Sequence, residues 1–114
     1  MDIRIINKPI TRVEAKEIAK EFYVDMVKGV VDLEREIIAL GGEWHIDANN
    51  VLMAEGSQQR DVWGFNFHFN KEPQDTIEYI SLINIRPMEG NYDMVVQDES
   101  RRKAMRAIIE RLII

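Results

Sequence analysis

A chain of 114 residues with 46% hydrophobic and 31% charged residues is long enough for one independent core and has the composition of a soluble globular protein. It contains no cysteine, which excludes disulfides, thiolate nucleophiles and zinc–thiolate sites and favours a cytoplasmic location. The net charge of −5 opposes a general attraction to nucleic acid, and no apolar run approaches the roughly 20 residues of a membrane helix. The amino terminus also lacks the pattern of a secretory signal.

The first predicted elements are a short strand and a helix. The segment Asp2 to Asn7 is rich in isoleucine, which predicts an edge strand or an extended arm. Thr11 and Glu14 have the spacing of a capping box. In this motif the threonine oxygen accepts a hydrogen bond from one unpaired amide at the helix start, and the glutamate carboxylate accepts one from another. A helix is therefore expected to begin after Thr11.

A second helical pattern follows and ends at Gly41-Gly42, which suits a left-handed helix cap. The sequence leaves open whether this is a separate helix or the continuation of the first. Because its apolar face is wider than one packed helix face commonly is, we expect a homodimer through it, with simple core packing as the alternative. The apolar stripe consists of Met26, Val30, Leu33, Ile37 and Leu40, widened by Val27, Val31 and Ile38.

After Gly42 the apolar period falls to about two residues, which predicts strands. Asp98 then has the side chain of a helix cap, before a final amphipathic helix. We therefore predict one α+β domain over residues 1–114: an N-terminal helical region, a four-stranded antiparallel meander, and a C-terminal helix packed on one sheet face. The four strands are expected at Glu43 to Asp47, Val51 to Ala54, Val62 to Asn70 and Thr76 to Arg86.

Parts of the chain resemble a known family. The runs GSQQRDVWGFNF and ISLINIRPMEGN, together with MVKGVVDLE and GGEWHID, are similar to the signature of a small prokaryotic family known only as a domain of unknown function. The resemblance implies a small stand-alone cytoplasmic protein and transfers no catalytic residue.

One candidate site lies at the end of the last predicted hairpin. If its strands pair symmetrically about the turn at 71–75, Arg60 faces Arg86 and Asn84 lies beside them. Two facing arginines with an amide suit a carboxylate or a phosphate, and Asn91 follows in the next loop. The alternative is structural: the arginines pair with carboxylates and the asparagines satisfy backbone groups.

A second candidate site combines Glu43, His45 and Asp47, which share one face of the first predicted strand, with His68. These residues could act as general acids and bases, or hold a metal through two imidazoles and a carboxylate. The alternative is a solvated strand face. Two histidines are a poor metal signature, so we expect no metal and no cofactor.

The function expected from the sequence is that of a binding or regulatory module for an anionic small ligand or a partner. A small hydrolase that uses His45, His68 and nearby carboxylates is the alternative, and whether the protein is an enzyme stays open. The element order is also similar to that of small bacterial messenger-RNA-cleaving toxins, but those are typically basic and this chain is acidic.

Overall fold

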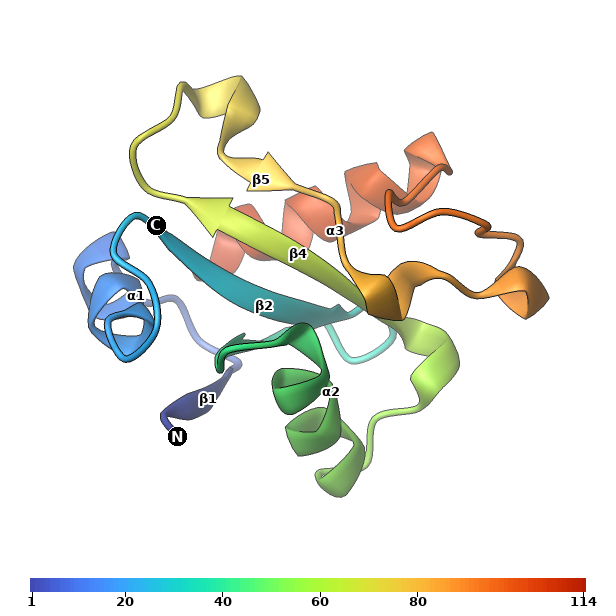
Figure 1. Ribbon diagram of the computed structural model, residues 1–114, viewed down its shortest axis with the longest axis horizontal. Coiled ribbons are helices and arrows are strands. Elements are labelled where there is room, and N and C mark those ends of the chain that lie inside the picture. Colours follow the sequence, from blue (N-terminus) through green and yellow to red (C-terminus); the bar gives the residue numbers. More distant parts are fainter.

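The structure is a computed structural model that describes residues 1–114, and at its centre is one five-stranded sheet in which all neighbouring strands are antiparallel (Figure 1). Their order across the sheet is β1-β3-β2-β4-β5. The strands are β1 (Ile3–Ile6), β2 (Met26–Asp32), β3 (Ile37–Gly41), β4 (Val62–His68) and β5 (Ile77–Glu78). The three α-helices are α1 (Arg12–Ala19), α2 (His45–Ala54) and α3 (Glu99–Leu112).

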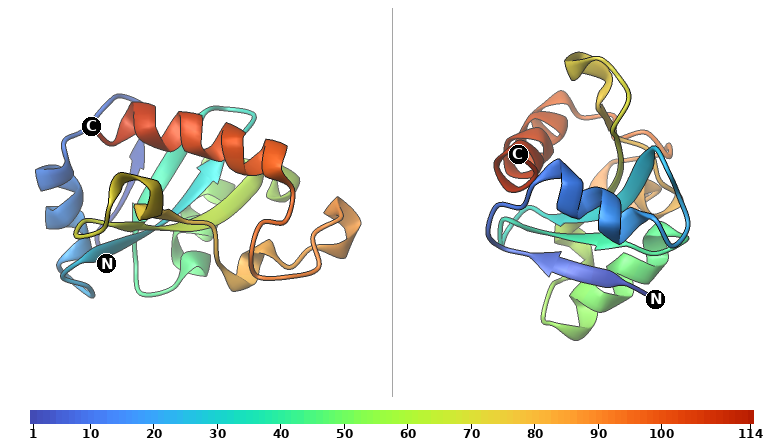
Figure 2. Two further views of the ribbon diagram at one scale, coloured as in Figure 1. Left: turned by 90° about the horizontal axis from the view of Figure 1, so that it is seen from above. Right: turned by 90° about the vertical axis from the view of Figure 1, so that its left-hand side faces the viewer.

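The sheet is covered on both faces. Helices α1 and α3 lie on one face and α2 on the other, as the views in Figure 2 show. The larger apolar core fills the α1–α3 side and includes Trp63, Phe65 and Phe67 of β4 and Phe69 just after it. A smaller core lies beneath α2, where Ala48 and Leu52 pack against Val30 and Val62. The fold is therefore α+β with three layers.

Three local predictions are confirmed. The isoleucine-rich segment forms the edge strand β1. The capping box is present, because the Thr11 side chain accepts a hydrogen bond from the Glu14 amide at 3.1 Å and the Glu14 carboxylate accepts one from the Thr11 amide at 3.3 Å. Asp98 caps α3 by accepting from the Ser100 amide at 2.9 Å. Each of these signals is contained in a few consecutive residues, so neighbouring elements do not change it.

The helix predicted over Met26 to Leu40 is wrong, because this segment is the β2–β3 hairpin. Asp32 organises its turn: the carboxylate accepts from the amides of Glu34 and Arg35, both at 3.0 Å, and from the Ser57 hydroxyl at 2.6 Å. Glu36 then takes a positive φ of 55°. The stripe on which the homodimer was predicted therefore lies inside a covered sheet, and the dimer stays a prediction without that support.

The strands predicted at Glu43 to Asp47 and Val51 to Ala54 are also wrong, since the chain forms α2 there. Gly41 and Gly42 do not cap a helix; they end β3 with φ values of 116° and 91° and turn the chain into α2. Asp47 supplies the start signal by accepting from the amide of Trp44 at 3.0 Å. The Asp47 carboxylate thus caps α2, although the residue just before the helix is the aromatic Trp44.

The last predicted strand is shorter than expected. Of its residues, only those of β5 pair with β4, and Asn66 faces Glu78 instead of Ile80, a shift of two residues in register. Beyond β5, the side chain of Asn84 makes the backbone hydrogen bonds to β4 that a neighbouring strand would make. Its amide accepts from Gly64 N at 2.8 Å and donates to Gly64 O at 3.0 Å.

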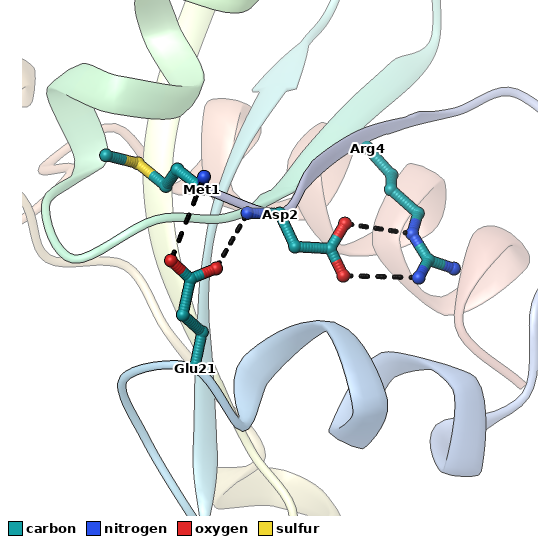
Figure 3. Close-up of polar contacts among 4 residues, drawn as sticks. All are labelled: Met1, Asp2, Arg4 and Glu21. Atoms are coloured by element: carbon teal, nitrogen blue, oxygen red, sulfur yellow. Dashed lines mark hydrogen bonds and ion pairs between the residues drawn. The ribbon is translucent and has the colours of Figure 1, made fainter.

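The amino-terminal residues are held against the end of α1 (Figure 3). The Asp2 amide donates to the Glu21 carboxylate at 2.8 Å, and the terminal amine of Met1 lies 3.9 Å from the same group. The Asp2 carboxylate in turn accepts two hydrogen bonds from Arg4, at 3.1 and 3.2 Å. None of the helices is both long and apolar enough to cross a membrane.

Candidate ligand-binding pocket

A row of three polar side chains crosses the sheet on the α2 side. Lys28 on β2 faces Asn66 on β4, which faces Glu78 on β5. The Lys28 amine lies 3.4 Å from Asn66 Oδ1, and Asn66 Nδ2 donates to Glu78 Oε1 at 2.8 Å. Because the alternate residues of β4 pack into the aromatic core on the other face, these groups are fixed to a rigid strand.

His45, the first residue of α2, is buried beside this row. Its Nε2 lies 2.8 Å from the carbonyl oxygen of Phe65, which requires a proton on that nitrogen. Burial, reinforced by the positive charge of Lys28, lowers the pKa of His45 to about 4. The ring is therefore neutral near physiological pH, and the cation that remains here is Lys28.

His68 and Glu78 form the outer end of the same face. His68 Nε2 lies 3.2 Å from Glu78 Oε1. The hydrogen bond from Asn66 is the main cause that lowers the pKa of Glu78, and the bond from His68 acts in the same direction. Glu78 is thus held as a carboxylate by its neighbours.

Apolar side chains from two segments stand above the row and make a cavity of about 330 Å³, which we call the Lys28 pocket. One wall comes from the start of α2, where Trp44 is 61% exposed. The other comes from the segment after β5, where Leu82 is 72% exposed. The pocket is lined by Lys28, Trp44, His45, Ile46, Asn66, Ile80, Ser81, Leu82, Ile83 and Met94.

Lys28 has an unusual environment for a lysine. It makes no ion pair; its amine contacts the Asn66 amide oxygen and lies over the ring of Tyr23, whose centroid is 5.5 Å from Nζ. Burial lowers the pKa of Lys28, and the nearby Glu78 carboxylate opposes that shift. The amine is therefore partly desolvated and not neutralised by a contacting carboxylate.

The second wall is kept in place by buried polar groups. Gly64 leaves room for it: a methyl group added there would come within 2.5 Å of Ser81 Cβ. Asn84 bonds both backbone groups of Gly64 and the carbonyl of Met94. Asn91 donates to the carbonyls of Asn84, Asp93 and Val95 and accepts from the Gln97 amide. The loop is thus tied to β4 by side chains.

These contacts show how the structure uses the residues of the first predicted site. Asn84 and Asn91 are fully buried and bonded to backbone groups. Arg86 donates to the carbonyls of Ile83, Gln59 and Val62, and its guanidinium lies 3.8 Å from the centroid of the Trp63 ring. Burial lowers the pKa of Arg86 to about 10.

Arg60 does not join that network and lies exposed, 3.9 Å from the Asp61 carboxylate. Arg101 is the second guanidinium near Trp63, at 4.0 Å from the ring centroid. The geometry matches the structural alternative for both asparagines, while Arg86 bonds carbonyls instead of the carboxylates expected in that alternative. An anion-binding role for Arg60, Asn84, Arg86 and Asn91 stays a prediction.

A family model described as a protein of unknown function, DUF5674, matches residues 4–112. The chain belongs to this family. Neither the search of curated proteins nor that of solved structures found a match. The family resemblance is confirmed, and membership of DUF5674 assigns no role to any residue.

In this DUF5674 member the second predicted site is rearranged. Glu43, His45 and Asp47 do not share a strand face, because they lie around the start of α2. The carbonyl of Glu43 accepts from the Tyr23 hydroxyl at 2.6 Å, and Asp47 caps the helix. No group of three or more His, Asp or Glu side chains could hold a metal ion. His45 and His68 do border the same polar row, through Asn66 and Glu78.

Sequence reasoning missed Lys28, Glu78 and Trp44. Lys28 lies within the segment predicted as a helix, although in MVKGVVD the lysine alternates with Val27 and Gly29 and would stand on the opposite face of a strand. Glu78 lies within the strand predicted at Thr76 to Arg86, but symmetrical pairing about the turn sets it opposite His68 instead of Asn66. Trp44 lies within the strand predicted at Glu43 to Asp47 and instead stands exposed beside the pocket.

Proposed function

We propose that the protein is a binding module for a small ligand that has an apolar body and an anionic head group, held in the Lys28 pocket. The observation that carries the proposal is the unpaired, partly buried amine of Lys28 in a cavity whose lining residues are mostly hydrophobic. Sites for small molecules commonly have this composition, with a few polar groups that orient a ligand among apolar walls.

Charge supports the choice of an anion. Lys28 is the one cation among the lining residues, because His45 is neutral. Glu78 touches Asn66 and His68 instead of the amine, so it leaves the ammonium without a contacting counter-ion. A partly buried charge without a partner is costly, and a ligand carboxylate at this position would relieve the cost.

Size and surface support an apolar body of modest dimensions. A cavity of about 330 Å³ lies near the lower end of the range for small-molecule sites. Trp44, Ile46 and Leu82 are large apolar side chains left in contact with water at its mouth. Covering them would add apolar burial worth roughly 25 cal/mol per Å².

The hydrolase alternative has less support. A histidine with a pKa of about 4 is a weak base near neutral pH, and the His45 nitrogen that faces Phe65 is occupied by a carbonyl. Asp47 caps a helix, and the Glu78 carboxylate is bonded to two side chains. No observation therefore favours hydrolysis over binding.

The test uses three ring compounds of similar size: benzoate, benzamide and benzylamine. Titration calorimetry and tryptophan fluorescence, to which Trp44 and Trp63 both contribute, should detect benzoate binding and weaker or no binding of the neutral and cationic analogues. Lys28→Met removes the charge while keeping chain length, and should weaken benzoate binding by about tenfold or more, the usual worth of a hydrogen bond to a charged group.

The matched control is Lys103→Met, which removes an exposed lysine of α3, on the other sheet face, that is paired with Glu99. It should leave benzoate binding unchanged. Equal binding of all three compounds, or unchanged benzoate affinity in Lys28→Met, would contradict the proposal. A homodimer and a cytoplasmic location, both expected from the sequence, stay predictions beside it.

A further inference from the structure

We propose that Lys28 is a reactive amine that condenses with an aldehyde or ketone group on a ligand held in the Lys28 pocket. This inference rests on the proposed function in one respect, that the pocket admits small ligands. It goes further by assigning covalent chemistry to one nitrogen atom. The surroundings of that atom differ from those of other lysines of the chain in three respects.

First, no carboxylate neutralises the amine of Lys28. Lys20 and Lys103 lie exposed and pair with Glu17 and Glu99 at 2.6 and 3.6 Å. The contact with Glu17 raises the pKa of Lys20 and so favours its ammonium form, which has no lone pair to donate. Lys28 has no such contact, and its amine is 3.4 Å from an amide oxygen.

The second step is desolvation. Lys28 stands in the middle of the sheet, with the walls around Ile46 and Ile83 above it, and burial lowers its pKa while that of Lys20 is raised by Glu17. The groups that face the amine are Asn66, the Tyr23 ring, neutral His45 and, through Asn66, Glu78. Glu78 favours the ammonium form, but burial is the larger effect. Desolvation in an apolar pocket is a common way to activate a lysine nucleophile.

The third step is placement. A carbonyl compound whose apolar body lies between Trp44 and Leu82 has its head group directed at the base of the pocket, where Lys28 stands. Holding the two reactants together replaces a bimolecular encounter by an effectively unimolecular step. The exposed Lys71 lies in a hollow in which Ile77 is the one hydrophobic lining residue.

The reaction balances without an additional oxidant or reductant. The nitrogen lone pair forms a bond to the carbonyl carbon as the C=O π electrons move to oxygen, and one N–H proton is transferred to that oxygen to give a carbinolamine. Loss of the hydroxyl group with the second N–H proton releases one water molecule and leaves an imine. Hydrolysis reverses both steps, so the product is a reversible covalent complex.

The experiment uses the full chain and benzaldehyde, whose ring is the apolar body and whose aldehyde is the head group directed at Lys28. The protein is incubated with the aldehyde and cyanoborohydride near neutral pH, and peptides are analysed by mass spectrometry. Reduction of the imine fixes a mass gain equal to the aldehyde minus one oxygen atom. We expect Lys28 to be modified at least about tenfold faster than Lys71 and Lys103, owing to the effective concentration within the pocket.

Two further measurements separate this inference from the proposed function. Excess benzoate should suppress labelling of Lys28 and leave labelling of Lys103 unchanged. Lys28→Arg keeps a cation for benzoate but removes the nucleophile, so it should bind benzoate and lose the selective adduct. Because labelling rates are compared among lysines of the wild-type chain, the test does not depend on that variant folding.

Equal labelling of all lysines with benzoate binding intact would overturn the reactive amine and leave the binding module standing. Selective labelling of Lys28 without benzoate binding would support the amine and contradict the preference for anions. Uniform labelling together with no benzoate binding would overturn both.

Discussion

His45 should make the stability of the protein depend on pH in a calculable way. In the folded state its pKa is about 4, because the ring is buried near Lys28, whereas an unfolded histidine has a pKa of about 6.5. Below the unfolded value the unfolded chain binds a proton that the folded chain does not, so stability falls as the pH falls toward the folded pKa. Linkage with these two values gives a loss of about 2 kcal/mol between about pH 7 and about pH 5.

The assay is urea unfolding at the two pH values, followed by tryptophan fluorescence, on the wild type and on His45→Gln. Glutamine can keep a donor toward the Phe65 carbonyl and cannot titrate. The variant should lose less stability on acidification than the wild type, by about 2 kcal/mol. His68→Gln, which removes the only other histidine, is the control and should keep the contribution of His45. An equal pH dependence of His45→Gln and the wild type would refute the reasoning.

Three further predictions concern stability and can be measured by the same unfolding assay at neutral pH. Asn84→Ala should lower the free energy of unfolding by about 2–4 kcal/mol, because it leaves buried backbone groups of Gly64 without partners. A loss below about 1 kcal/mol would contradict the role of Asn84 in holding the loop to β4. Gly64→Ala should cost about 1–3 kcal/mol through its close approach to Ser81, and a neutral result would mean that the loop moves freely. Thr11→Ala should cost about 1 kcal/mol through the lost cap, and no change would show that Glu14 alone suffices.

The parts of the fold that sequence predicted are those with a local signal. The β4 alternation was readable because one face of that strand is aromatic core and the other carries Gly64, Asn66 and His68. The caps at Thr11 and Asp98 were readable because each involves two residues in one helix turn. In these places the local preference and the tertiary environment agree.

The β2–β3 hairpin was misread because both of its faces are covered. Val27 and Val31 face α1 and α3, while Val30 and Ala39 face α2, so nearly every position is apolar and the period of two is lost. Steps of four and three residues then fitted the same sequence to a helix. The short length of β2 and β3 and their valine and isoleucine residues favour strands. The helices that cover both faces come from distant parts of the chain, however, and leave no local pattern.

The site was missed for related reasons. Helix α2 starts after Trp44, which is not a usual capping residue, and its buried side chains include the polar Asn49, so neither its start nor its stripe was clear. The register of β5 could not be fixed because Asn84 replaces the strand that symmetrical pairing assumes. Lys28, Asn66 and His45 come together only when β2, β4 and α2 pack in the folded chain, so no local sequence pattern marks the pocket.

The most direct test of the Lys28 pocket is a titration of isotope-labelled protein with benzoate, followed by two-dimensional amide NMR. The account predicts that the largest shifts fall on the residues around the pocket, at 44–46 and 80–83, and that they disappear in Lys28→Met. Shifts centred instead on Arg60 and Asn91, or no shift at any benzoate concentration, would contradict it.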